Sequence, residues 1–98
     1  MPHSDKPALP PDFQWVEGAG KDTVCMASIP VVDVLGEGQA WLAVVVFASP
    51  EVVPQRMACR NKQAALRWAS RWVHQRINLL TRAAARMHLN PASAPDRG

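Results

Sequence analysis

The stretch that decides the fold is NKQAALRWASRWVHQRINLLTRAAARMHLN, residues 61–90. It contains neither glycine nor proline, and it is rich in alanine, leucine, arginine and glutamine, which favour helices. Asn61 is a good N-cap residue, and Pro91 directly after the stretch cannot continue a helix. The sequence therefore predicts a single long amphipathic helix at the C-terminal end of the fold.

The apolar face of this expected helix is broad. One stripe holds Leu66, Ala69, Val73, Ile77, Leu80, Ala84 and Met87, and the adjoining stripe holds Ala65, Trp68, Trp72, Leu79 and Ala83. Together they cover about half of the helical wheel, more than the ~100° expected of a helix that lies on one sheet. About 28 residues extend ~42 Å as a helix, whereas a strand of about nine residues reaches only ~30 Å. The last turns therefore need a partner, or else the helix breaks near Asn78 and folds back.

Upstream of this stretch, the chain has the alternation and the turn residues of a β-sheet. We expect a strand at 13–17, then a glycine-bearing loop, then a long extended segment at 23–35. Pro30 interrupts that segment, and because proline has no amide for a ladder bond, it belongs at an edge or a bulge. The glycine-bearing turn at 36–38 lies between two β-rich runs, so it predicts a β-hairpin.

The second arm of this hairpin, residues 39–47, is apolar on both faces. One face holds Trp41, Ala43, Val45 and Phe47, and the other holds Leu42, Val44 and Val46. Such a strand is covered on both sides, so we expect the helix against one face and something else, such as a second subunit, against the other. Residues 52–59 then predict an edge strand whose Arg56 and Arg60 point outward and discourage edge-to-edge pairing.

These elements predict an α+β fold, an antiparallel meander of three to four strands with one long C-terminal amphipathic helix packed across one face. The 98 residues and 48% apolar content suffice for a single modest core, which we place in one domain at residues 13–90. The proline-rich residues 1–12 are expected to form a disordered or extended tail, because proline blocks helix and sheet pairing. Residues 91–98 are expected to form a second disordered tail.

The charges are divided unevenly along the chain. Residues 1–51 carry two cations and seven anions, whereas residues 52–95 carry eight cations and no acidic side chain. Such asymmetry points to an anionic partner. The competing interpretation, which we favour, is that the acidic half neutralises the basic half within the fold or across a dimer.

No residue pattern in the sequence predicts catalysis or metal binding. His3, His74 and His88 lack a cysteine or an acidic residue at the spacing of a metal site or a general base. Cys25 and Cys59 lie in apolar surroundings, so we expect buried reduced thiols, and a bridge between them stays open. We therefore expect no enzymatic activity, no catalytic residues, no metal and no cofactor.

Nothing in the sequence predicts a membrane segment. The longest apolar run, residues 40–48, has nine residues, well short of the ~20 that a membrane-spanning helix needs. The N-terminus has no basic region followed by an apolar stretch, so no secretory signal is expected. These features predict a small soluble cytoplasmic domain.

The expected function is a protein-interaction module that is homodimeric through its C-terminal helix. Tryptophan and arginine are over-represented at interface hot spots, and the candidate interface is Trp68, Trp72, Leu79, Leu80, Ala83 and Met87. The alternative is a nucleic-acid-binding protein that contacts phosphates with the basic face of the same helix, through Lys62, Arg67, Arg71 and Arg82. The acidic N-terminal half counts against that alternative, because it weakens the field that attracts nucleic acid.

Overall fold

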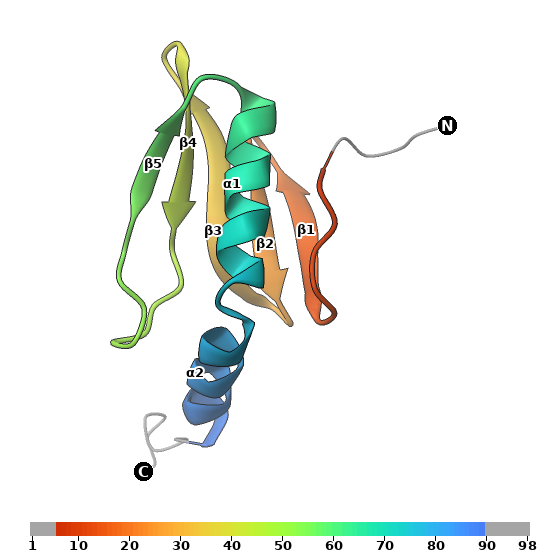
Figure 1. The fold of residues 1–98 in the computed structure, drawn as a ribbon, viewed down its shortest axis with the longest axis vertical. Helices are drawn as coiled ribbons and strands as arrows, with labels where there is room; N and C mark the ends of the chain where they lie inside the picture. The colour runs from red at the N-terminus through yellow and green to blue at the C-terminus, as the bar shows by residue number, and fades with distance from the viewer. Residues whose placement is uncertain (1–5, 90–98) are drawn as a thin grey trace.

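A computed structural model of the chain describes residues 6–89, and the side chains of residues 6–86. Figure 1 shows an antiparallel sheet, one helix along a face of that sheet, and a second helix below it. The elements in chain order are β1 (Phe13–Gly18), β2 (Lys21–Met26), β3 (Ile29–Glu37), β4 (Ala40–Val45), β5 (Arg56–Cys59), α1 (Lys62–His74) and α2 (Ile77–Leu89). The expected α+β class is confirmed.

The sheet is a five-stranded meander with the strand order β1-β2-β3-β4-β5. The expected meander and the hairpin of β3 and β4 are confirmed, but three to four strands is too few. The segment 23–35 is divided by a turn at Ala27 and Ser28, between β2 and β3. That turn contains no glycine, so the usual turn signal is absent. Pro30 lies opposite Cys25, where the register of these two strands shifts, as its missing amide requires.

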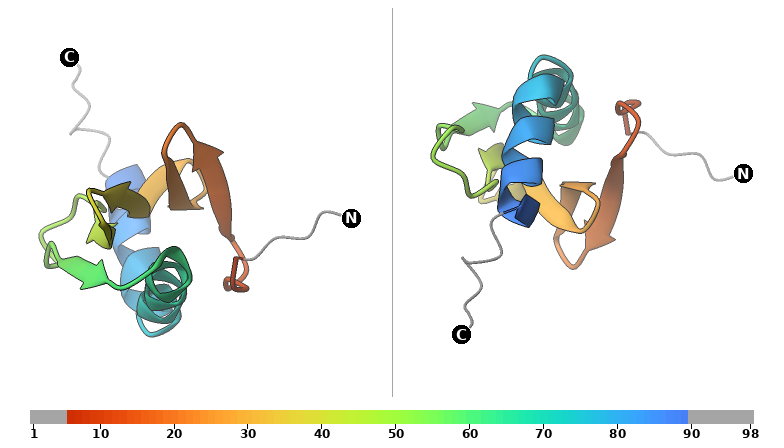
Figure 2. Two further views of the ribbon diagram at one scale, coloured as in Figure 1. Left: turned by 90° about the horizontal axis from the view of Figure 1, so that it is seen from above. Right: turned by 90° about the horizontal axis from the view of Figure 1, so that it is seen from below.

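The sheet curls around α1, which lies against its concave face (Figure 2). Alternation along each strand brings every second side chain to this face. The buried residues between sheet and helix include Val24, Val34, Ala43, Leu66, Ala69 and Val73. Within the described residues, no helix lies against the convex face (Figure 2). The cover that we expected on the second face of β4 is therefore not provided by a helix of this chain.

The expected single long helix is wrong, because a turn at Gln75 and Arg76 separates α1 from α2. The Arg76 backbone N–H donates to the carbonyl of Val73 at 3.0 Å, and its guanidinium donates to the carbonyl of Trp72 at 3.3 Å. These bonds satisfy carbonyls that the end of α1 leaves without a helical partner. The turn lies just before Asn78, near which a break was the alternative to a binding partner.

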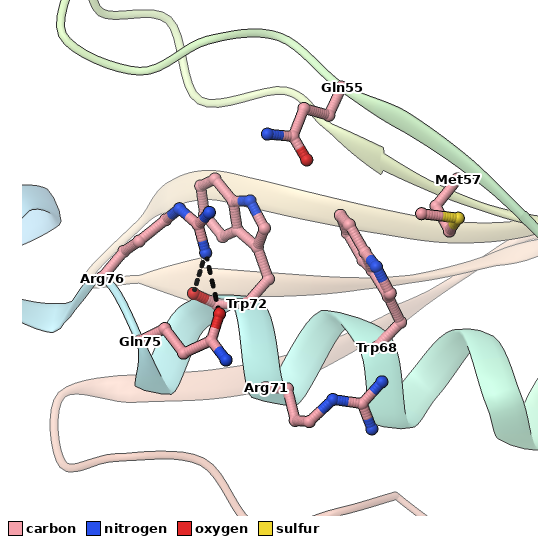
Figure 3. A pocket seen from close by; sticks show the side chains of 7 residues that line it. All are labelled: Gln55, Met57, Trp68, Arg71, Trp72, Gln75 and Arg76. Atoms are coloured by element: carbon pink, nitrogen blue, oxygen red, sulfur yellow. Dashed lines mark hydrogen bonds between the residues drawn. The ribbon is translucent and has the colours of Figure 1, made fainter.

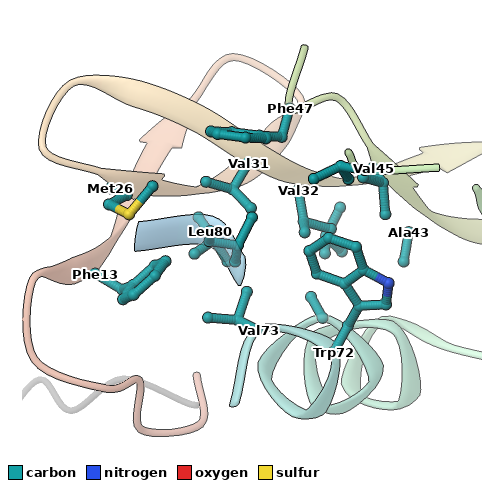
Figure 4. Close-up of a cluster of buried hydrophobic side chains, with 14 of the residues drawn as sticks. Phe13, Met26, Val31, Val32, Ala43, Val45, Phe47, Trp72, Val73 and Leu80 are labelled. Atoms are coloured by element: carbon teal, nitrogen blue, oxygen red, sulfur yellow. The ribbon is translucent and has the colours of Figure 1, made fainter. Parts of the chain in front are cut away.

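Helix α2 turns across the end of the sheet instead of continuing past it (Figure 2). Leu80 is fully buried there, and Ala83 is 2% exposed. Figure 4 shows Leu80 in a cluster with Phe13, Met26, Val31 and Phe47. A straight helix would leave these leucine and alanine side chains in water, whereas burying a leucine is worth about 1.5–3 kcal/mol. Part of the broad apolar face is therefore buried within the chain itself.

Residues 6–12 have no helix or strand, yet they pack against β1 and α1. The indole N–H of Trp15 donates to the carbonyl of Pro7 at 3.0 Å. The hydroxyl of Ser70 on α1 donates to the carbonyl of Ala8 at 2.9 Å. This part of the expected N-terminal tail is therefore held against the sheet and the helix, and the expected C-terminal tail lies outside the described residues.

Candidate binding groove

Among the described residues, three large hydrophobic side chains are exposed, namely Val16 (43%), Val53 (69%) and Met57 (40%). Val16 lies on the convex face of β1, since its neighbour Trp15 pairs with Val24 on the concave face. Met57 on β5 and Val53 in the loop before it line two hollows between this edge of the sheet and α1. Apolar side chains grouped in a hollow mark binding surfaces more often than single ones scattered on a surface do.

The larger hollow is a pocket of about 310 Å³ between α1 and β5 (Figure 3), lined by Gln55, Met57, Trp68, Arg71, Trp72, Gln75 and Arg76. A smaller hollow of about 140 Å³ shares three of these residues and is lined in addition by Glu51, Val52, Val53 and Leu79. We call the two hollows together the α1–β5 groove. One wall of the groove is the edge strand β5 with the loop before it, and the other wall is α1.

The strand register and the helical repeat together build this groove. Met57 pairs with Ala43 of β4, and because Ala43 faces α1, Met57 faces α1 too. Trp68 and Trp72 lie one turn apart, on the side of α1 that faces β5 (Figure 3). The curl of the sheet therefore brings β5 over the tryptophan side of the helix.

Trp72 forms the floor of the groove. Its side chain is 4% exposed, and its ring packs into the core (Figure 4). The indole nitrogen is buried and has no hydrogen-bond partner among the described residues. Figure 3 shows the nitrogen edge of the ring facing Gln55 and Trp68 across the groove. A buried donor without an acceptor costs about 1–3 kcal/mol, so an acceptor oxygen placed here would stabilise it.

Arg76 lies over the other side of the same ring. Its guanidinium is 4.7 Å from the centroid of the Trp72 ring, a cation–π distance. It also donates to the carbonyl of Trp72 at 3.3 Å and to Oε1 of Gln75 at 3.2 Å. These contacts fix a positive charge at the end of the groove where α1 turns into α2.

Two cations, Arg71 and Arg76, line the groove. Within the part of the chain that the structure describes, no carboxylate pairs with Arg60, Arg67 or Arg71. Of the described groove residues, only Glu51 is acidic, and it pairs with Arg86 of α2. The groove therefore combines an apolar and aromatic floor with a positive rim.

The structure divides the candidate interface residues between the core and the groove. Trp72, Leu80 and Ala83 are buried inside this chain, so little of their surface remains for a partner. Trp68 and Leu79 are half-buried, pack against the core and line the groove. The groove is therefore the part of the candidate interface that stays accessible.

Seven groove residues were not among the candidates predicted from the sequence, and they include Val53, Gln55 and Met57. The alternation in residues 52–59 puts Val53 and Met57 on one face of a strand. That signal does not tell which helix residues the face meets, so their proximity to Trp68 could not be inferred. The side chain of the remaining candidate, Met87, lies outside the described side chains.

The candidate anion-binding residues do not form one surface. Lys62 lies at the start of α1, 3.5 Å from the carboxylate of Asp22, and Asp22 is only 7% exposed. Lys62 is therefore engaged within the fold, in agreement with internal neutralisation of the acidic half. Arg67 and Arg71 are exposed on successive turns of α1, and Arg82 is exposed on α2.

Cys25 and Cys59 are free thiols, half-buried where we expected them to be buried. They do not meet, because Cys25 faces the convex side of β2 whereas Cys59 packs on the concave side, opposite Trp41. Burial raises the pKa of both thiols, and the Asp33 carboxylate raises that of Cys25 further. At neutral pH both thiols are therefore protonated and weakly nucleophilic.

No group of three or more histidine, cysteine or acidic side chains within residues 6–89 could hold a metal ion. None of the helices described is long and apolar enough to cross a membrane. Comparisons with protein-family models, curated proteins and solved structures find no match to this chain.

Proposed function

We propose that this protein is a non-enzymatic protein-interaction module that binds its partner in the α1–β5 groove. The main support is the placement of Val53 and Met57, two of the three exposed large hydrophobic side chains among the described residues, in one groove with Trp68. Aromatic residues, methionine and arginine are enriched at protein interfaces, and all three kinds line this groove.

The size of the groove favours a short anchoring segment over a flat protein surface. Its main pocket, about 310 Å³, is at the lower end of the range for ligand sites, about 300–1,000 Å³. At hot spots, an anchor side chain fills such a pocket while the surrounding contacts exclude water. We therefore infer that a short segment of the partner supplies most of the binding energy.

A peptide-display selection tests this proposal. A random peptide library is selected on the wild-type chain, and the recovered peptides are then measured on the Met57→Asp variant. Met57 is 40% exposed, so the fold tolerates the change, while a charge in the groove weakens peptide binding by about tenfold or more.

The control for this selection is Val16→Asp, which adds the same charge on the convex face, where Val16 is 43% exposed. We expect it to leave the affinity of the recovered peptides unchanged. A selection that recovers no peptide, or an equal loss of affinity in both variants, would count against the proposal.

Self-association through the C-terminal helix is the narrower form of the proposal. Because Trp72, Leu80 and Ala83 lie in the core, a dimer contact would depend on Trp68 and Leu79. A dimer in sedimentation at micromolar concentration, converted to a monomer by Leu79→Asp, would support it. A monomer under those conditions excludes self-association and leaves a different protein as the partner.

Nucleic-acid binding is the second candidate, and the exposed arginines beside Trp68 favour it. Proteins that bind single strands combine a cationic groove with aromatic rings on which bases stack, and Arg67 and Arg71 have no ion-pair partner among the described residues. Gel shifts with single- and double-stranded DNA and RNA at low salt test it, since phosphate contacts weaken steeply with salt. No retardation at high protein excess excludes this candidate.

A further inference from the structure

We propose that the segment bound in the α1–β5 groove is extended and acidic, and that it adds to β5 as a further strand while giving the Trp72 indole an acceptor oxygen. This inference rests on the proposed function, since it names the chemistry of the partner for the same groove. It follows from the free edge of β5, from the way the chain fills the matching space at β1, and from the donors and charges of the groove.

The outer side of β5 is free to pair. β5 is the last strand of the sheet order, and within the described residues it pairs only with β4. An edge strand turns a row of backbone N–H and C=O groups outward, which is a template for an added strand. Because the sheet curls around α1 (Figure 2), a strand added to this edge would lie along the helix and over the groove.

The opposite edge of the sheet shows how such a space is filled. The chain's own segment 6–12 runs along the outer edge of β1 (Figure 1) and contacts both β1 and α1. There the Trp15 indole donates to the carbonyl of Pro7 at 3.0 Å, and Ser70 of α1 donates to the carbonyl of Ala8 at 2.9 Å. A segment without helix or strand thus contacts a sheet edge and α1 and supplies a backbone acceptor to a tryptophan.

The indole N–H of Trp72 could donate the same kind of hydrogen bond on the β5 side. Its Nε1 is buried and has no partner among residues 6–89, and the nitrogen edge of the ring faces the groove (Figure 3). An indole N–H only donates, so the complementary atom is a carbonyl or carboxylate oxygen. An extended segment carries one backbone carbonyl per residue and can therefore provide it.

The charges around β5 select for acidic side chains. No carboxylate among the described residues pairs with Arg60, Arg67 or Arg71. Arg56 of β5 meets Glu37 only in an exposed contact of 3.5 Å, and such pairs contribute little. Carboxylates on an added strand would form charge-assisted hydrogen bonds with these guanidinium groups. A second copy of β5 would bring its own arginines and be repelled.

The apolar side chains of the groove suit the other face of the same strand. Successive residues of a strand point to opposite faces. Arg56 precedes Met57 on β5 and so points to the convex face, where acidic residues of the added strand would meet it. The apolar residues between them would face the helix. Val53, Met57 and Trp68 offer exposed or half-buried apolar surface to those residues. The expected ligand is therefore an extended segment in which acidic and aliphatic side chains alternate.

The test uses a labelled peptide of alternating glutamate and leucine with both ends blocked, and its binding is measured by fluorescence anisotropy. We expect saturable binding that weakens as the salt concentration rises past ~0.1 M, where charges are screened over about 10 Å. A peptide with lysine in place of glutamate should not bind. Methylating alternate backbone nitrogens should weaken binding about tenfold or more, because those amides can no longer join the ladder.

Two variants of equal charge change locate the site. Arg71→Glu alters the groove, and we expect it to weaken the glutamate–leucine peptide about tenfold or more. Arg82→Glu alters an exposed cation on α2 that does not line the groove, and we expect unchanged affinity. Equal losses in both variants would mean a general attraction to the basic half of the chain, and would overturn the inference.

The Trp72 contact is read from its indole N–H signal in a nitrogen–proton correlation spectrum of the wild-type chain. The signal is assigned by its disappearance in Trp72→Phe, and circular dichroism checks that this variant is folded. We expect the saturating peptide to shift the signal and to slow its exchange with solvent. A signal that the bound peptide leaves unmoved overturns the assignment of the acceptor.

The outcomes separate this inference from the proposed function. If display recovers groove-binding peptides that are basic, or that bind as well after backbone methylation, the acidic strand is excluded and the interaction module stands. If no peptide binds, both fail. If oligothymidylate binds in place of the peptide and is lost in Arg71→Glu, the groove recognises nucleic acid and the inference is overturned.

Discussion

At the scale of single residues, Trp68 and Trp72 show how differently two residues of one helical stripe can be placed. They lie one turn apart, yet Trp72 is 4% exposed and belongs to the core, while Trp68 is half-buried at the groove. The helical wheel could not separate them, because burial depends on how far the opposing strand and loop reach. The two residues therefore have different roles, one in stability and one in the accessible surface.

We expect Trp72→Ala to lower the free energy of unfolding by about 3–5 kcal/mol, the range for a large buried aromatic side chain. Trp68→Ala should lower it clearly less, because part of that ring is already in water in the folded state. Urea unfolding followed by circular dichroism measures both values. Equal losses would contradict the division of the two residues between core and groove.

The thiols lead to a prediction about pH. Burial raises the pKa of Cys25 and Cys59 in the fold, and Asp33 adds to the rise at Cys25. Since the folded state then holds these protons more tightly than the unfolded state, the associated stability is present below the thiols' ordinary pKa of 9.0. It is lost as the pH rises through the folded values.

The measurement is alkylation by iodoacetamide as a function of pH, in the single-thiol variants Cys25→Ser and Cys59→Ser. We expect the midpoint of each folded variant to lie above that of the same chain in urea. Asp33→Asn should lower the midpoint of Cys25 and leave that of Cys59 unchanged. A folded midpoint at or below the unfolded one would show that burial does not govern these thiols.

At the scale of elements, the two ends of α1 were predictable to different degrees. The side chain of Asn61 accepts a hydrogen bond from the backbone N–H of Ala64 at 2.8 Å, which confirms the expected N-cap. The other end lies at Gln75 and Arg76, where the sequence has neither glycine nor proline to mark it. The C-terminal end is made by contacts of Arg76 with α1 and by the docking of α2.

Removing the N-cap should weaken α1 without touching its packing. We expect Asn61→Ala to lower the free energy of unfolding by about 1 kcal/mol, because the first turn loses one of its acceptors. Asn61→Asp keeps an acceptor oxygen and should retain most of the stability. Thermal unfolding of the three chains compares them, and an alanine variant as stable as the wild type would show that solvent replaces the cap.

At the scale of the whole molecule, α2 packs against the end of the sheet and completes the core. Leu80 has no exposed surface and lies with Phe13, Val31 and Phe47 (Figure 4). These residues come from α2, from two strands and from the loop after β4. One leucine therefore holds together parts of the chain that are far apart in sequence.

We expect Leu80→Ala to lower the free energy of unfolding by about 2–5 kcal/mol, through lost burial and the cavity left behind. Leu79→Ala changes the adjacent, half-buried side chain and should cost clearly less. Urea unfolding gives both values, and binding of an apolar dye reports whether α2 has separated from the sheet end. A Leu80→Ala chain as stable as wild type would mean that α2 contributes little to the core.

The sequence by itself determined the features that depend on near neighbours. The Asn61 cap, the irregularity at Pro30, the hairpin of β3 and β4 and the edge position of β5 all follow from local backbone preferences. Four groove residues were predicted from the sequence: helical spacing places Trp68, Trp72 and Leu79 on the apolar face and Arg71 on the basic face.

Only the tertiary structure decided where α1 stops, which apolar residues stay exposed, and which cations are already engaged. The break before α2 follows from the end of the sheet, where turning buries Leu80 and Ala83. Lys62 is engaged because folding brings Asp22 to it, and Met57 joins Trp68 because the sheet curls. Burial and ion pairing are set by elements that are distant in the chain, so no local pattern could encode them.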